Sequence, residues 1–420
     1  MSGYRRLIEH MALGACAFIL SRAVLSLFLA PGETPTDGNL VWKLILSISY
    51  MSIFVALLPF YREVLYICGR NWHVVALVAL ALCSFLWAAT PSLVFRRGIA
   101  VLGTTLLGVA LALLLSLHDQ IRLLVWLFRA MAILSLACVV FAPSYGIADS
   151  GEWRGVFDHK NGLGSMMALS ILVEWHFPAY TGFAKFAKWQ GLLLSGLLLL
   201  FSRSLTPTLA LIGSLVCIEI FKFANQHLRV PFYVTGLVAF LAALSAAVIW
   251  FSNNERIMLA MGRSADLTGR TEIWSWVVSF ILERPILGYG YSGFWLGASP
   301  ESISIDRTMG TAIMYSHNGY LEILLNLGVV GFFLALVFVA TGIRRALYRS
   351  NLGQSRVDLW PLALLLYFLF HNFGECTILY QDLEWAVCVA AVIGADAALL
   401  SFEEEQQDAS FSLMLAEQPK

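Results

Sequence analysis

The chain has 420 residues, of which 59% are hydrophobic and only 13% are charged, and its 27 basic side chains balance its 27 acidic ones. A soluble domain carries roughly a quarter charged residues, so this composition indicates a polytopic, all-α membrane protein. The zero net charge excludes a basic surface for nucleic acid. The seven cysteines lie in or beside apolar runs without disulfide or metal spacing, and we interpret them as small core hydrophobes.

Apolar runs that are long enough to cross a bilayer recur along the chain, since a span needs about 20 such residues. Arg5 and Arg6 precede the first run as in a secretory signal, but the run is longer than a signal core and predicts a retained span. The twelve predicted spans cover residues 8–30, 40–60, 72–89, 97–116, 123–143, 160–177, 188–203, 205–222, 231–251, 315–341, 358–373 and 383–401. The seventh and eighth also fit one broken hairpin.

The lysines and arginines predict which side each loop faces. If the N-terminus lies inside, most of them fall in inner segments and few in short outer loops, which favours cytoplasmic termini. The outer exceptions are Arg96, Arg97, Arg154, Lys160 and Arg203. We therefore predict spans one to nine in residues 1–251, a large outer loop at 252–314, spans ten to twelve in 315–401 and a cytoplasmic tail at 402–420.

Within the large loop, "RTEIWSWVVSFILERP" has apolar residues at helical spacing but is too short to cross a membrane. We predict an interfacial helix there, anchored in the outer leaflet by Trp274 and Trp276. The "GYGYSGFW" stretch that follows resembles a phosphate loop only superficially, and we expect a flexible aromatic loop.

Polar side chains gather at the predicted outer ends of the spans. They lie in "GEWRGVFDHKNGLG", in "FSRS", in "LTGRTEIW", and at the start of the tenth span. Arginines at such a site suit a phosphate-bearing ligand, because guanidinium stays charged and holds phosphate oxygens bidentately. His317, in the first turn of the tenth span and near these arginines, is a candidate for proton transfer as a neutral imidazole.

These motifs, together with "RPILGYGYSGF" and "SHNGYLEILLNLGVVG", resemble the O-antigen ligase and polymerase superfamily. "GVFDHKNGLG" and "LWAATPSLVFRRG" are similar to its ExoQ-like exopolysaccharide-polymerase branch, and the resemblance covers most of residues 75–335. It implies about 12 transmembrane helices, a large periplasmic loop between the ninth and tenth, and a GT-C-like fold. It also implies a metal-independent inverting glycosyltransferase with no cofactor, in the bacterial inner membrane.

The resemblance implies roles for individual residues. Arg203 and Arg270 would bind the diphosphate of an undecaprenyl-diphosphate-linked donor, and His317 would activate the acceptor hydroxyl. Arg154, Lys160 and Asn161 would supply further donor contacts, and Asn318 and Glu322 would lie on the acceptor side. No residue is assigned to a metal.

Structural roles compete with each of these assignments. His317 also fits a helix cap, Arg203 a headgroup contact and Arg270 an ion pair with Glu272. Arg154 and Lys160 equally fit contacts to lipid headgroups. Arg22 and Arg129, inside apolar runs, fit either a functional role or pairing with a carbonyl or carboxylate. An acidic cluster at the last outer loop fits helix capping, acceptor contact or a divalent-metal site, and its members are His371, Glu375, Asp382 and Glu384.

Three functions fit the sequence. The first is a polymerase that joins lipid-linked repeat units at the periplasmic face, with chain-length regulators and export proteins as implied partners. The second is a ligase that moves a finished glycan onto lipid A core or a protein. The third is a transporter of a lipid-linked sugar, which the lack of an internal repeat and of midplane polar residues disfavours. The "HKNGLG" motif favours the polymerase.

Overall fold

The computed structural model describes residues 2–23, 40–224, 270–310, 312–353 and 355–396. Within them the backbone forms helices and connecting loops, with one isolated bridge between Ile147 and Trp153. The helices are α1 (Ser2–Leu20), α2 (Leu40–Leu57), α3 (Tyr61–Arg70), α4 (Trp72–Cys83), α5 (Pro91–Leu114), α6 (Leu117–Phe141), α7 (Pro143–Gly146), α8 (Lys160–His176), α9 (Gly182–Ser202), α10 (Leu205–Phe223), α12 (Arg270–Glu283), α13 (Pro300–Met309), α14 (Gly319–Leu352), α15 (Arg356–His371) and a last helix at 383–396.

Six stretches of helix among the described residues are long and apolar enough to cross a membrane, which confirms a polytopic membrane protein. They are Leu40–Arg70, Pro91–Leu114, Leu117–Phe141, Gly182–Ser202, Leu205–Phe223 and Gly319–Leu352. The predicted span at 231–251 lies outside the described residues, and every other predicted span overlaps a helix. The seventh and eighth spans are two separate helices, α9 and α10, joined by a tight turn. The total of twelve stays a prediction.

The core of the bundle lies along α8, α15 and the last helix, which bury most of their side chains. Trp360, Tyr367 and Trp385 are among the largest fully buried side chains. A helix that is apolar all round belongs in a core or a bilayer. The exposed apolar side chains of α2, such as Ile48 and Met51, are therefore suited to contact lipid.

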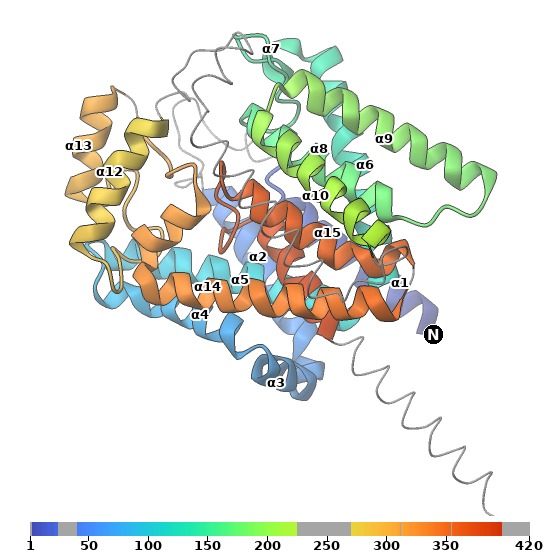
Figure 1. Ribbon diagram of the computed structural model, residues 1–420, viewed down its shortest axis with the longest axis horizontal. Helices are drawn as coiled ribbons and strands as arrows, with labels where there is room; N and C mark the ends of the chain where they lie inside the picture. Colours follow the sequence, from blue (N-terminus) through green and yellow to red (C-terminus); the bar gives the residue numbers. More distant parts are fainter. Residues whose placement is uncertain (1, 24–39, 225–269, 311, 354, 397–420) are drawn as a thin grey trace, which may run out of the picture.

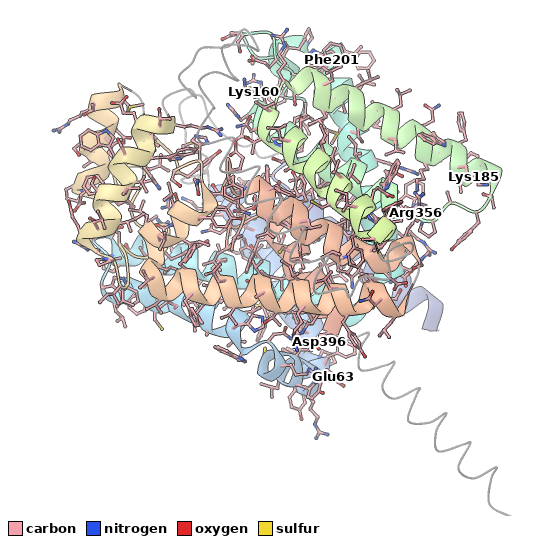
Figure 2. The ribbon with its side chains drawn as sticks, viewed as in Figure 1. Glu63, Lys160, Lys185, Phe201, Arg356 and Asp396 are labelled. Carbon is pink, nitrogen blue, oxygen red and sulfur yellow. The ribbon has the colours of Figure 1, made fainter. Side chains whose placement is uncertain are left out.

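The helices run alternately between two ends of the bundle, which we name the His317 end and the Asp396 end. α8, α10 and α14 begin at the His317 end, where α9 and α15 finish. Figure 2 shows Lys160 and Arg356 at opposite ends of the α8, α10 and α15 group. At the Asp396 end, Asp396 forms ion pairs with Arg70 at 2.9 Å and Arg345 at 3.2 Å.

A helix is present where the sequence predicts one, as α12, and α13 follows it, although the sequence did not predict α13. The place of α12 at the membrane interface stays a prediction. Figure 1 shows both helices beside the start of α14, and they share an apolar cluster with it that includes Val277, Phe294 and Leu325. Trp274 donates its ring N–H to the carbonyl of Ser316 at 2.8 Å. Trp274 thus joins α12 to the segment before α14, and its contact with the outer leaflet stays a prediction.

The segment between α12 and α13 is mostly buried over residues 288–295, so the prediction of a flexible aromatic loop there is wrong. Its large rings are among the buried side chains: Tyr289, Tyr291, Phe294 and Trp295. The tyrosine hydroxyls bond to protein groups: Tyr289 donates to the carboxylate of Glu283, and Tyr291 donates to the carbonyl of Leu379. The aromatic composition serves packing against the bundle.

This segment fills a break in α14. Gly328 has φ +62° and ψ −163°, which interrupts the helical hydrogen bonds. Backbone groups of the segment replace them: Tyr289 N–H donates to Leu325 O at 2.9 Å, and Val329 N–H donates to Pro285 O at 2.8 Å. Within a membrane, a broken helix needs such protein partners because lipid offers none.

The first testable prediction concerns this break. Gly328→Ala should lower the free energy of unfolding by at least about 1–3 kcal/mol, since this backbone conformation is nearly restricted to glycine. The added Cβ would also collide with the Ile286 carbonyl. The measurement is the melting temperature of the purified protein in detergent.

Gly196→Ala is the matched control, because nothing lies within 4 Å of a Cβ at that position of α9. It should leave the melting temperature unchanged or raise it. Equal melting temperatures for the two variants would contradict the account of the break.

Candidate functional site

Five segments meet at the His317 end of the bundle: the start of α8, the α9–α10 turn, the start of α12, the residues before α14, and the loop after α15. Asn318 caps α14, and its side-chain oxygen accepts the N–H groups of Tyr320 and Leu321. The backbone of Gly319 donates to the carbonyls of Asn372 and Glu375. These bonds fix the loop after α15 against the start of α14.

Two of the predicted site residues have a left-handed backbone. His317 has φ +53° and precedes the cap of α14, and Arg203 has φ +51° and ends α9. This conformation costs about 1–3 kcal/mol for a residue other than glycine and persists where the surroundings enforce it. Such strain tends to occur at functional sites.

The carboxylate of Glu375 joins these segments. Its Oε1 accepts from the side-chain amide of Asn161 at 2.7 Å and from Arg270 Nη2 at 3.2 Å. Its Oε2 accepts from the hydroxyl of Tyr315 at 3.0 Å and lies 3.7 Å from Nδ1 of His317. One buried carboxylate therefore brings together three residues that the sequence analysis selected.

The charge of Glu375 is stable in this setting. Burial alone raises the pKa of its carboxyl, but His317, Arg270 and His371 lower it more, so that the pKa falls from 4.5 to about 2. Glu375 is thus ionised at neutral pH. Arg270 is held in place twice, since its Nη1 also donates to the carbonyl of Gly374 at 2.8 Å.

The His317 ring has one buried and one accessible edge. Nδ1 is buried and faces Glu375, whereas the side chain as a whole is 26% exposed, so the accessible edge is the one that carries Nε2. The ring also contacts Tyr315, with centroids 4.3 Å apart. The predicted position in the first helical turn is wrong, because His317 precedes the N-cap Asn318, and the Glu375 carboxylate lies between His317 and Arg270.

Arg203 lies in the turn beside this cluster. The next residue, Ser204, donates its hydroxyl to the side-chain oxygen of Asn161 at 3.0 Å. Asn161 thereby connects the turn to Glu375. Arg203 itself is exposed.

The other predicted donor contacts have protein partners. Lys160 pairs with Glu152 at 2.8 Å, and this bond holds the pKa of Glu152 at about 2. Arg154 donates from Nε to the carbonyl of Tyr145 at 2.6 Å. Both side chains therefore brace the loop before α8.

The predicted acceptor-side residues also have structural contacts. Besides the capping role of Asn318, the carboxylate of Glu322 accepts from Trp295 Nε1 at 3.1 Å, Ser316 N–H at 2.9 Å and Asn326 Nδ2 at 2.9 Å. Their contact with an acceptor stays a prediction.

The remaining ionisable residues divide among separate contacts. His371 lies 3.3 Å from Glu384 and 3.1 Å from the hydroxyl of Ser165. Asp382 caps the last helix through Trp385 N–H, and burial together with Glu384 raises the pKa of Asp382 to about 7. The described residues contain no group of three or more His, Cys, Asp or Glu side chains suited to hold a metal ion.

Two arginines in apolar runs have structural partners, as one alternative predicted. Arg129 forms a bidentate pair with Glu174 at 2.5 and 3.0 Å. Arg22 donates to the carbonyl of Gln381 at 3.3 Å and lies over the ring of Tyr380. Arg270, in contrast, pairs with Glu375 and not with the predicted Glu272.

Two comparisons with known proteins give matches to this chain. A family model described as O-Antigen ligase matches residues 190–336, a range that includes Arg203, Arg270 and His317. The resemblance to the O-antigen ligase family and its ExoQ-like members is confirmed. The chain is 26% identical over 295 residues to the exopolysaccharide production protein ExoQ of Rhizobium meliloti (strain 1021). That match covers 67% of this chain and 66% of the relative, slightly less than two thirds of its length.

Glu375 and Tyr315 are the residues whose part in the site the sequence analysis missed. Glu375 was assigned to an acidic cluster near the last outer loop, but three of its partners lie 214, 105 and 60 residues away in the chain. The available signal was its position at the end of a span on the same predicted face as His317.

The second prediction tests this carboxylate. Glu375→Gln should lower the free energy of unfolding by about 3 kcal/mol, because it removes the charge that Arg270 pairs with and turns an amide N–H toward other donors. The measurement is the melting temperature in detergent at neutral pH. Glu272→Gln, an exposed carboxylate on α12, is the control and should be neutral.

The difference in the free energy of unfolding between wild type and Glu375→Gln should also depend on pH. Since the folded pKa of Glu375, about 2, lies below its ordinary value of 4.5, its stabilisation is complete above pH 4.5 and is lost as the pH falls toward 2. A constant difference between wild type and Glu375→Gln from pH 7 down to 2.5 would contradict the ionised carboxylate.

Proposed function

We propose that the protein is a polysaccharide polymerase that joins undecaprenyl-diphosphate-linked oligosaccharide repeat units at the periplasmic face of the bacterial inner membrane. The two matches to known proteins support a polysaccharide-processing membrane enzyme. The observation that carries the finer proposal is the Glu375 carboxylate, which holds an arginine suited to phosphate and a histidine suited to proton transfer in one cluster.

The distribution of basic residues supports the proposed orientation. The ends of α3, α14 and α15 that meet at the Asp396 end carry Arg70, Arg345, Arg349 and Arg356. By the positive-inside rule this end faces the cytoplasm, together with both termini, and the His317 end faces the periplasm. The proposed architecture is GT-C-like, with about twelve spans and the large loop, 252–314, between the ninth and tenth.

In this proposal the donor diphosphate binds to Arg203 and Arg270, with Arg154, Lys160 and Asn161 shaping the adjacent loop. A guanidinium has five N–H donors, so Arg270 retains donors beyond its bonds to Glu375 and Gly374. Cations placed in advance stabilise the charge that grows on the leaving group. A lipid diphosphate leaves readily, so its departure needs no proton.

His317 is the proposed base. The ionised Glu375 carboxylate favours the tautomer with hydrogen on Nδ1, which leaves the lone pair on the accessible Nε2. The acceptor hydroxyl oxygen bonds to the anomeric carbon from the face opposite the diphosphate while its proton moves to Nε2. The carbon–oxygen bond to phosphate breaks, the diphosphate keeps the electron pair, and the anomeric configuration inverts. Glu375 stabilises the imidazolium that forms.

A ligase that transfers a finished glycan to lipid A core or a protein is the second candidate, and the description of the matching family favours it. The chemistry at His317 would be the same, and only the acceptor would differ. Transport of a lipid-linked sugar is weaker, since the polar cluster lies at one end of the described bundle and not near its middle.

The third prediction tests the function. Arg203→Ala, Arg270→Ala or His317→Ala should each lower the rate of bond formation at least about 100-fold, the lower range for loss of a base or an oxyanion contact. The measurement is mass analysis of the product from purified protein with lipid-linked donor. A ladder of repeats indicates a polymerase, and one transfer to a foreign acceptor indicates a ligase.

Arg307→Ala is the matched control, because Arg307 is an exposed arginine on α13. It should retain wild-type activity, and EDTA should leave the wild-type rate unchanged. Normal polymer from His317→Ala would remove the base assignment, and absence of any new glycosidic bond with wild-type protein would refute both transferase candidates.

A further inference from the structure

His159, in the "HKNGLG" motif, has a defined tautomer. It precedes α8 as the N-cap, and its Nδ1 accepts the backbone N–H of Asn161 at 3.2 Å. A ring nitrogen that accepts a hydrogen bond carries no hydrogen, so a neutral His159 has its hydrogen on Nε2. His159 is therefore a hydrogen-bond donor at its outer edge.

The surroundings favour the neutral form of this histidine. Partial burial lowers the pKa of His159, and Lys160 and His317 act in the same direction against the opposing effect of Glu375 and Asp158. The start of a helix also disfavours a positive charge on the capping side chain.

The donor is open to a ligand. Within the described part of the chain, the bond from Asn161 is the only hydrogen bond to the His159 side chain, which is exposed. Its neighbours in the motif are already engaged, since Lys160 pairs with Glu152 and the side chain of Asn161 binds Glu375 and Ser204. His159 also lies two residues before Asn161, whose side-chain amide donates to Glu375 at 2.7 Å, so the start of α8 places it beside the Glu375 cluster.

We infer that His159 donates its Nε2–H to a phosphate oxygen of the lipid diphosphate, beside Arg270. The inference rests on the proposed function and adds a neutral donor to the arginines of that site. The two histidines then have opposite tautomers and opposite tasks. His317 presents a lone pair to the acceptor hydroxyl, and His159 presents a hydrogen to the leaving group.

Two substitutions separate donation from capping. His159→Asn keeps an acceptor near the Nδ1 position, and asparagine is a favourable N-cap, but it removes the outer N–H. His159→Gln extends an N–H toward the Nε2 position but loses the capping acceptor. The protein is used at full length in liposomes, with a lipid-diphosphate-linked oligosaccharide as donor and farnesyl diphosphate as a phosphate probe.

His159→Asn should lower kcat/KM about 10- to 100-fold, as expected for a hydrogen bond to a charged group, and weaken farnesyl diphosphate inhibition. Its melting temperature should equal that of wild type. His159→Gln should keep more activity than His159→Asn and melt at a lower temperature. His118→Asn, in α6 at the opposite end of the bundle, is the control and should match wild type in each measurement.

Two results would overturn the inference. Wild-type kinetics for His159→Asn, with loss confined to His159→Gln, would mean that the histidine only caps α8. A raised KM for the acceptor with unchanged farnesyl diphosphate inhibition would mean that the Nε2–H of His159 bonds to the acceptor sugar and not to phosphate. If wild type forms no glycosidic bond, the proposed function fails, and binding of farnesyl diphosphate measured directly still decides the His159 contact.

Discussion

The arrangement at the His317 end depends on one buried negative charge. Removing a carboxylate from water costs several kcal/mol unless donors replace the lost hydration. For Glu375 these donors come from the start of α8, the start of α12 and the segment before α14. The stability of the carboxylate thus requires that separate parts of the chain approach one another. The same approach brings the phosphate-binding and proton-accepting groups of the proposed reaction together.

The sequence predicted the membrane class and most helices because long apolar runs are a local signal. It also selected Arg270, His317 and Asn161, since each stands in a short recognisable motif near a span end. It failed for Glu375, whose role exists only through partners far away in the chain. No local pattern distinguishes a carboxylate that caps a helix from one that joins three segments.

The segment "PILGYGYSGFW" shows a second limit of local reasoning. Glycines and aromatic rings are typical of a flexible surface loop, and the run around Gly328 is typical of one continuous helix. The prediction of a flexible loop was wrong, and the predicted span at 315–341 contains a break, for the same reason. The break at Gly328 leaves backbone groups without helical partners, and the glycines of the distant segment allow its backbone to approach closely enough to supply them. Each feature is understandable only with the other.

The filled break in α14 has a mechanical consequence. The segment that repairs α14 follows directly from α12, so the helix that begins with Arg270 and the helix preceded by His317 share hydrogen bonds as one rigid unit. In the proposed reaction, the leaving-group position at the start of α12 and the base position before α14 would therefore keep one relative placement from one turnover to the next.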